Sequence, residues 1–83
     1  AQADREALRR LRQEVRKCEE RIEKLEEMRE KLDARLADPA LYSPGRHAEA
    51  EKWQKKRAEL AEGMERAEAF WIAAQEKLDT AES

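Results

Sequence analysis

Apolar residues recur along the first half of the chain in alternating steps of three and four. With one interruption at Arg29, they are Leu8, Leu11, Val15, Cys18, Ile22, Leu25, Leu32 and Leu36. Such spacing places all of them on one stripe of an α-helix, as do the a and d positions of a coiled coil. We therefore predict a long amphipathic helix over about residues 4–37.

The second half of the chain carries the same spacing without interruption. Its members are Ala50, Trp53, Arg57, Leu60, Met64, Ala67, Trp71, Ala74, Leu78 and Ala81. We therefore expect a second helix over about residues 44–81. The two stripes together, with Arg29 included, are called the seam below.

Between the stripes, the segment LADPALYSPG contains both prolines and one of the two glycines. A residue that precedes proline is pushed away from helical geometry. Asp38 is therefore expected to end the first helix and to cap a short turn that begins with Pro39. Ser43 is expected to cap the second helix in the same way, with Pro44 in its first turn.

This turn of about residues 38–44 also separates two possible folds. The ring of Tyr42 is expected to pack against Leu36 or Ala50 and to close the tip of a hairpin. The alternative is one continuous helix that dimerises through the same seam. That helix would hold both prolines and Gly45 in its interior, at a cost of about 3 kcal/mol for each proline, so we reject it.

Two stripes of equal length joined by a short turn predict an antiparallel hairpin. The sums of facing residue numbers stay nearly constant, from Leu36 opposite Ala50 to Leu8 opposite Leu78. The predicted fold is therefore all-α: a two-helix antiparallel coiled-coil hairpin that forms a single domain over residues 1–83. The positions that flank the seam suggest two ion pairs, Arg35 with Glu49 and Arg5 with Glu82.

The composition limits the functions open to such a hairpin. With 83 residues, of which 46% are charged, the chain can bury little and has no room for an enclosed active site. Because it lacks a Gly-rich phosphate loop and an obvious nucleophile–base pair, we do not expect an enzyme. Cys18 is the only cysteine and is expected to pack against Ala67. His47 has no partners at metal-ligand spacing, so no metal and no cofactor are expected in this chain.

Targeting signals are equally scarce. The longest apolar run, AFWIAA at 69–74, is too short to span a bilayer, and no signal-peptide pattern opens the chain. We therefore expect a cytoplasmic protein without a membrane partner. Since the sequence starts at Ala1 without a methionine, we also expect it to be a piece of a longer protein.

Charge is distributed unevenly along the predicted rod. Residues 29–57, the tip half, contain eight basic and five acidic residues, whereas residues 58–83 contain two basic and seven acidic residues. The basic tip suggests contact with the phosphates of a nucleic acid. The alternative is that these side chains only solvate the outside of a coiled coil, as charged helix faces often do. The candidate phosphate-binding residues are Arg35, Arg46, Lys52, Lys55 and Lys56.

The seam contains one layer of like charge and two tryptophans. Arg29 faces Arg57, and we expect the two side chains to extend outward unless acidic neighbours reach in; a deliberately weak layer is the alternative. Trp53 and Trp71 are expected to pack in the core, in preference to stacking on bases.

Two large apolar side chains lie off the seam near the open end of the hairpin, which we call the base. Phe70 and Ile72 flank Trp71 in sequence and are expected to form an exposed apolar patch. We interpret this patch as a protein-docking face, either for the rest of a larger protein or for a second copy in a weak homodimer.

Residues 32–71 read LDARLADPALYSPGRHAEAEKWQKKRAELAEGMERAEAFW. This segment resembles the C-terminal domain of the ABC-F subfamily of ATP-binding cassette ATPases, particularly the Uup type. The resemblance is carried by the heptad run, by the DPALY turn, and by Ala67, Glu68 and Trp71, which match an A-E-x-x-W pattern. One departure is the charged segment DREALRRLRQEV, which stands where the family has a basic lead-in and a Leu-Pro step.

The resemblance implies a parent protein with two cassettes that bind ATP and Mg²⁺ and with this hairpin at its C-terminus. It also implies DNA, with branched DNA as one form, as a ligand, and ribosomal RNA as the alternative. Two hypotheses follow for the chain itself. The first is a non-catalytic nucleic-acid-binding arm that uses the basic tip, with the N-terminal basic run as a further candidate surface: Arg9, Arg10, Arg12, Arg16 and Lys17. The second is a structural spacer or protein- and ribosome-interaction arm that docks through its base.

Overall fold

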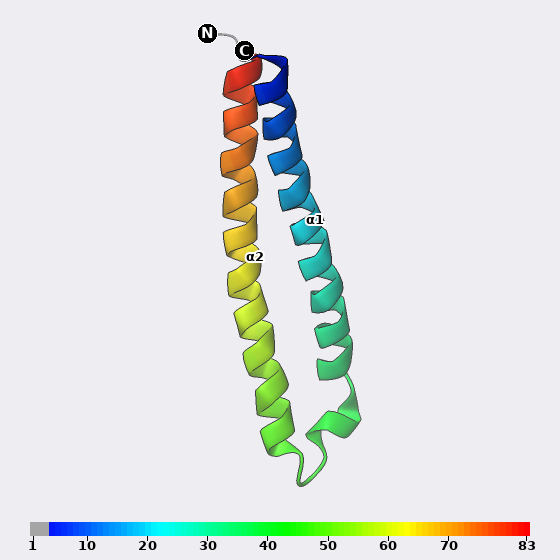
Figure 1. Cartoon of the computed structure of the whole chain (residues 1–83). Helices are drawn as coiled ribbons and strands as arrows, with labels where there is room; N and C mark the ends of the chain where they lie inside the picture. The colour runs from blue at the N-terminus through cyan, green and yellow to red at the C-terminus, as the bar shows by residue number, and fades with distance from the viewer. Residues whose placement is uncertain (1–3) are drawn as a thin grey trace.

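The computed structural model describes residues 4–83 and shows two long helices joined by a compact turn (Figure 1). Helix α1 spans Arg5–Leu36, the 3₁₀ helix η1 spans Pro39–Tyr42, and helix α2 spans His47–Glu82. The helices run antiparallel, so the start of α1 and the end of α2 lie at the base (Figure 1). The molecule measures 64 × 15 × 14 Å. The predicted all-α hairpin is therefore confirmed.

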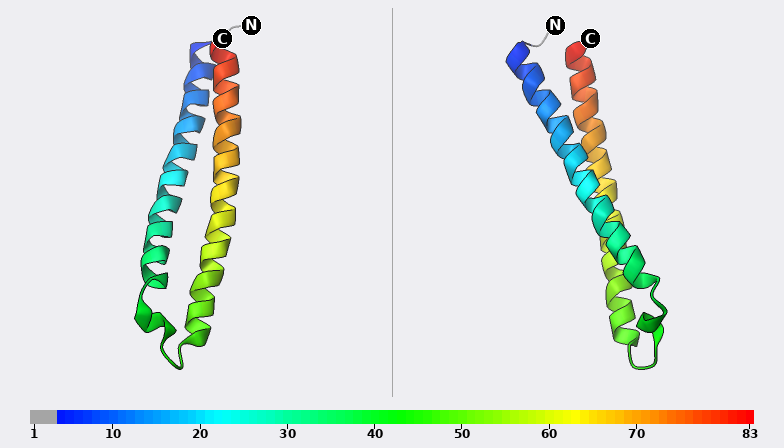
Figure 2. Two further views of the ribbon diagram at one scale, coloured as in Figure 1. Left: turned by 180° about the vertical axis from the view of Figure 1, so that it is seen from behind. Right: turned by 90° about the vertical axis from the view of Figure 1, so that its right-hand side faces the viewer.

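The seam forms the contact between the helices along the whole rod. Each seam residue is buried or half-buried. All α1 residues outside the seam, except Ala7, are exposed. A buried cluster of Val15, Ala74 and Leu78 lies near the base, where Leu8, Leu11, Cys18 and Trp71 pack against it. The predicted register pairs six of these residues across the two helices: Leu8 with Leu78, Leu11 with Ala74, and Val15 with Trp71. The right-hand view of Figure 2 shows the helices crossing, so they do not lie strictly parallel, as coiled-coil packing requires.

Two aspartates cap the helices of the first half of the hairpin. The Asp4 carboxylate accepts a hydrogen bond from the Ala7 amide at 2.7 Å at the start of α1. Asp38 does the same for η1, because its carboxylate accepts from the Ala40 amide at 3.0 Å while Pro39 occupies the first position. These bonds satisfy amide donors that the first turn of a helix leaves unpaired.

The start of α2 differs from the prediction. Ser43 does not cap α2; it ends η1, and its amide donates to the Ala40 carbonyl at 3.3 Å. The chain then passes through Gly45, whose φ of +90° is left-handed and incompatible with a right-handed helix. Helix α2 therefore begins only at His47, with Arg46 as its capping residue and no capping bond from a side chain.

The tip is closed by a residue that the sequence analysis did not single out. Leu41 of η1 is only 2% exposed and packs at the tip end of the contact between the two helices. Tyr42, whose ring was expected to pack against Leu36 or Ala50, is 54% exposed. Its hydroxyl instead donates to the carbonyl of Leu36 at 2.7 Å and so satisfies a free acceptor at the end of α1.

Both predicted interhelical ion pairs are replaced by others. Glu49 pairs with Arg46 in its own helix end at 3.0 Å and not with Arg35. At the base, Glu82 pairs with Arg12 at 3.1 Å and not with Arg5. The first exchange favours a partner three residues away, which needs less ordering of long side chains than a partner across the hairpin.

The arginine layer of the seam is partly neutralised. Arg57 Nε donates to the Asp33 carboxylate at 2.7 Å, so an acidic neighbour does reach this layer. Arg29 is half-buried beside it. Neither helix in the described part of the chain has an apolar stretch long enough to cross a bilayer.

Candidate functional site at the tip

Three cationic side chains gather around one indole near the turn. The guanidinium carbon of Arg35 lies 4.3 Å from the centre of the Trp53 ring, and the ammonium groups of Lys52 and Lys56 lie 5.4 and 5.8 Å from it. Arg35 comes from α1 and the other residues from α2, so the packing of the helices assembles this group. Cations within about 6 Å of an aromatic centre are attracted by the ring quadrupole. We call Arg35, Lys52 and Lys56 the tip cluster.

The tip cluster has no acidic ion-pair partner. Among the described residues, no carboxylate lies within 4.0 Å of any cluster member. The acids nearby pair with other side chains: Asp33 with Arg57, Glu49 with Arg46, and Glu51 with His47 when that imidazole is protonated. Arg35 acts on Glu49 only at longer range, where its charge contributes to the lowered pKa of that carboxyl.

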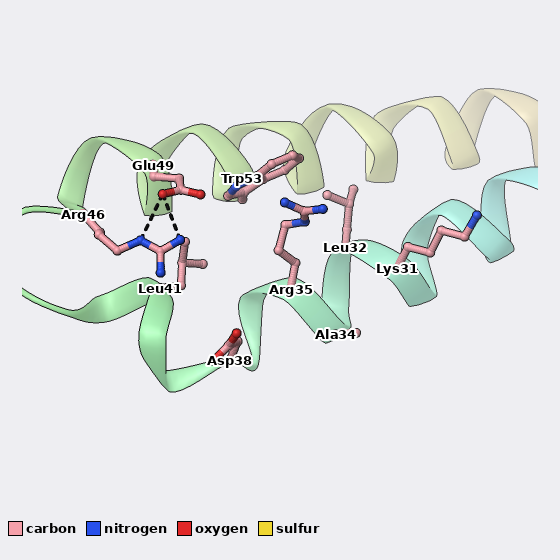
Figure 3. A pocket seen from close by; sticks show the side chains of 9 residues that line it. All are labelled: Lys31, Leu32, Ala34, Arg35, Asp38, Leu41, Arg46, Glu49 and Trp53. Atoms are coloured by element: carbon pink, nitrogen blue, oxygen red, sulfur yellow. Dashed lines mark hydrogen bonds and ion pairs between the residues drawn. The ribbon is translucent and has the colours of Figure 1, made fainter.

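An open pocket of about 630 Å³ lies beside the cluster, between the end of α1 and the start of α2. Figure 3 shows Arg35 reaching toward Trp53 from α1, with Arg46 and Glu49 joined on the other side. Leu32 and Leu41 add apolar surface, and Lys31 adds another basic group to the wall. The lining residues are Lys31, Leu32, Ala34, Arg35, Asp38, Leu41, Arg46, Glu49 and Trp53.

The indole N–H of Trp53 is buried and has no hydrogen-bond partner. It lies near enough to the Glu49 carboxylate to help lower the pKa of that group, but the two do not meet the distance and angle of a hydrogen bond. A buried donor without a partner costs stability. The face of the Trp53 ring therefore contacts cations, whereas its polar edge makes no hydrogen bond.

Arg46 stabilises the turn. It donates from Nε to Glu49 at 3.0 Å and from Nη1 to the Ala40 carbonyl at 2.9 Å. The pKa of Glu49 is lowered, first by the hydrogen bond from Arg46 and further by its charge, while partial burial opposes the shift. These contacts tie η1 to the first turn of α2.

The structure divides the five predicted phosphate-binding residues. Arg35, Lys52 and Lys56 come together over Trp53. The donors of Arg46 are used within the turn, and Lys55 is exposed next to Lys56 without joining the cluster.

Trp53 was predicted to pack in the core, and its contact with three cations was not predicted. The spacing places Lys52 and Lys56 one residue before and three after Trp53, but it does not determine the rotamers that bring their ammonium groups to the ring. In the predicted register Leu32 faces Trp53, and Arg35 follows Leu32 by one helical turn.

The two apolar residues near the base do not form one patch. Phe70 is 68% exposed and Ile72 is 51% exposed, but they border different grooves between the helices, one with Lys17 and Lys77 and the other with Glu19 and Glu68. Residues two apart on a helix point about 200° from each other, which explains the separation. Within residues 4–83, no set of three or more His, Cys, Asp or Glu side chains is placed to hold a metal ion.

Comparison with known proteins places most of the chain in one family. Residues 7–76 match the model of a family described as the ABC transporter C-terminal domain. The match covers most of both helices and the whole turn. The chain matches no curated protein and no solved structure.

Proposed function

Because the chain belongs to the ABC transporter C-terminal domain family, we propose that it is a nucleic-acid-binding arm of an ABC protein of the ABC-F, Uup type. The arm binds phosphates with the tip cluster, and DNA is the proposed ligand. In this proposal ATP and Mg²⁺ bind to cassette domains of a longer parent protein, and the hairpin itself is not catalytic.

The observation that carries the proposal is the set of three cations around Trp53 without a carboxylate partner. Long basic side chains lose conformational freedom when they bind a phosphate. Packing on the indole restrains Arg35, Lys52 and Lys56 beforehand, which lowers that cost. Each phosphate contact then gains from the release of counterions.

The length of the hairpin would hold the cluster away from a parent protein. Its rod is 64 Å long, and the turn lies at the end opposite the start of α1 and the end of α2 (Figure 1). A parent protein attached at the base would therefore present the cluster at a distance. Residues 58–83 of the base half have five more acidic than basic residues and repel phosphates.

The test is a fluorescence-anisotropy titration against branched DNA, duplex DNA and structured RNA at two salt concentrations. The variant is Lys52→Gln with Lys56→Gln. Its control is Lys24→Gln with Lys77→Gln, which removes the same charge from the base half. We expect salt-sensitive binding by the wild type and a loss of at least about tenfold in the tip variant, because two phosphate contacts are removed.

The control variant is expected to bind within about twofold of the wild type, since its lysines are far from the tip cluster. Equal losses in both variants would mean that only total charge matters, which contradicts the proposal. Absence of binding to all three ligands at low salt would contradict it as well. The ligand with the largest affinity distinguishes DNA from RNA.

A second candidate function, docking on another protein or on a ribosome through the base, is favoured by the exposure of Phe70. A side chain that is 68% exposed contributes apolar surface that the hairpin itself does not use. Phe70→Gln is expected to leave folding unchanged and to abolish co-sedimentation with ribosomes if this function is correct. Retention of ribosome binding by Phe70→Gln, together with its loss in the tip variant, would exclude this alternative.

A further inference from the structure

A second groove, on the opposite flank of the rod from Phe70, combines an apolar floor with an acidic rim. Its volume is about 400 Å³, and we call it the acidic groove. It lies in the middle to base part of the hairpin, far from the tip cluster. Its lining residues are Glu19, Ile22, Glu23, Glu26, Glu68, Trp71 and Ile72.

The floor of the acidic groove is held in place by the fold. Ile22 and Trp71 belong to the seam and are half-buried. The indole N–H of Trp71 donates to the Glu19 carboxylate at 3.2 Å, which fixes the ring across the groove. Ile72 is 51% exposed at the edge. The three side chains thus leave apolar surface open to a partner.

The rim of the acidic groove consists of glutamates from both helices. Glu19, Glu23 and Glu26 come from α1 and Glu68 comes from α2, and all four are exposed. Among the described residues, none of them has a basic nitrogen of a Lys, Arg or His side chain within 4.0 Å. The fold therefore gathers four carboxylates without an ion-pair partner at the mouth of an apolar groove.

No basic side chain lines the acidic groove, whereas other grooves on the described rod contain basic residues. The tip pocket includes Lys31, Arg35 and Arg46. The groove beside Phe70 includes Lys17 and Lys77. The four glutamates at the rim of the acidic groove therefore lack the local compensation seen elsewhere, and an external cation would supply it.

We propose that the acidic groove binds a basic amphipathic helix of a partner protein. Apolar side chains of that helix pack on Ile22, Trp71 and Ile72, as an additional helix packs into the channel between two others. Its Lys or Arg residues reach the rim and compensate the charge of the four glutamates. This site does not depend on nucleic-acid binding at the tip.

A second copy of the chain fits the groove less well than such a helix. The densest basic run, Arg9 to Lys17, is part of α1, whose apolar side chains already face α2 in the seam. Its outward face offers arginines without apolar neighbours. A partner helix that carries apolar and basic residues on one free face matches both the apolar floor and the acidic rim of the groove.

The probe is an 18-residue helical peptide with Leu at every third or fourth position and Lys at the flanking positions. The same peptide with each Lys replaced by Glu serves as the probe control. Affinity is measured by titration calorimetry, and the site is identified from the indole N–H resonances of Trp53 and Trp71. We expect the Lys peptide to bind one to one and to shift the Trp71 resonance alone.

The decisive variant is Glu26→Gln with Glu68→Gln, and its matched control is Glu20→Gln with Glu27→Gln on the exposed outer face of α1. The rim variant is expected to weaken binding about tenfold, because two screened charge contacts are lost. The outer-face control is expected to change the affinity by less than about twofold. Ile72→Gln, at an exposed position that folding does not require, is expected to weaken binding without loss of helicity.

Equal weakening in the rim and outer-face variants would overturn the proposal, because it would reduce the effect to net charge. Equal binding of the Glu peptide, or a shift confined to Trp53, would overturn it too. A shift of Trp71 that depends on protein concentration without any peptide would assign the groove to a second copy and also contradict the proposal.

Discussion

Arg46 determines which cations at the tip remain available to a ligand. Its guanidinium group bonds to Glu49 and to the Ala40 carbonyl, so Glu49 is not paired with Arg35. Arg35 lies instead over the Trp53 ring at 4.3 Å. The contact between Arg46 and Glu49 at the start of α2 therefore leaves Arg35 of α1 without an ion-pair partner.

The pKa of Glu49 provides a direct test of this contact. It is lowered from its usual value of 4.5, chiefly by the hydrogen bond from Arg46. A lowered pKa in the folded state means that the contact stabilises the hairpin above about pH 4.5, and that this contribution is lost as the pH falls through the folded-state pKa. Arg46→Gln is expected to move the pKa upward toward 4.5, as followed by NMR titration of the Glu49 carboxyl carbon. Arg46→Lys tests whether charge alone suffices. An unchanged pKa in Arg46→Gln would contradict the assignment.

The two arginines that face each other in the seam are expected to respond differently to substitution. Arg29→Leu places an apolar side chain at a half-buried seam position and should raise the free energy of unfolding by about 1 kcal/mol. Arg57→Leu should gain less, because it also removes the 2.7 Å contact with Asp33. Urea unfolding of both variants measures the difference. A larger gain for Arg57→Leu than for Arg29→Leu would show that the Asp33 contact does not stabilise the layer.

At the scale of single elements, the two glycines have opposite roles. Gly63 lies inside α2, where an added Cβ would meet only the end of the Arg66 side chain at 3.9 Å. Gly63→Ala should therefore stabilise the hairpin by about 0.5–1 kcal/mol, because alanine is the better helix former. Gly45 has space around it but a φ of +90°, so Gly45→Ala should destabilise by about 1 kcal/mol or more. Thermal unfolding by circular dichroism measures both changes, and a fall in Tm for Gly63→Ala would contradict the first.

The helices were predictable from the sequence because their packing depends on one repeated spacing. Steps of three and four identify the seam, and every seam residue, including Arg29 and Arg57, is at least half-buried. The same rule cannot place residues around the turn, where a left-handed Gly45 moves the start of α2 to His47. Nothing in the Ser43–Pro44 pair shows that Ser43 ends η1 instead.

Side-chain partners were less predictable than the helices because several residues compete for each charge. Glu49 has Arg35 across the hairpin and Arg46 three residues away, and the shorter connection forms. Trp53 was recognised as a seam residue, but its association with Arg35, Lys52 and Lys56 depends on rotamers that spacing alone does not determine. The apolar patch of Phe70 and Ile72 was wrong as a single surface, since adjacency in sequence is not adjacency on a helix.

For the whole molecule, the distribution of charge matters more than the net charge of −2. The tip half has three more basic than acidic residues, and residues 58–83 have five more acidic than basic residues. Trp53 and Trp71, which mark the two proposed sites, lie eighteen residues apart on α2, or roughly 27 Å at the helical rise. This is about three Debye lengths at physiological salt, so each site interacts with its surroundings nearly independently. The two proposed sites, the tip cluster and the acidic groove, use these opposite charges.

This separation predicts how nucleic-acid binding should depend on salt. If Arg35, Lys52 and Lys56 each contact a phosphate, the logarithm of the association constant for duplex DNA should fall against the logarithm of salt concentration with a slope of about −3. Lys52→Gln with Lys56→Gln should reduce the slope to about −1, because two of the three contacts are lost.

The matched control, Lys24→Gln with Lys77→Gln, should keep the wild-type slope because those lysines contact no phosphate. Anisotropy titrations at four or more salt concentrations provide the slopes. The slope depends on the number of contacts and not on overall affinity, so it separates loss of phosphate contacts from partial unfolding. An unchanged slope in the tip variant would place the phosphates elsewhere on the rod.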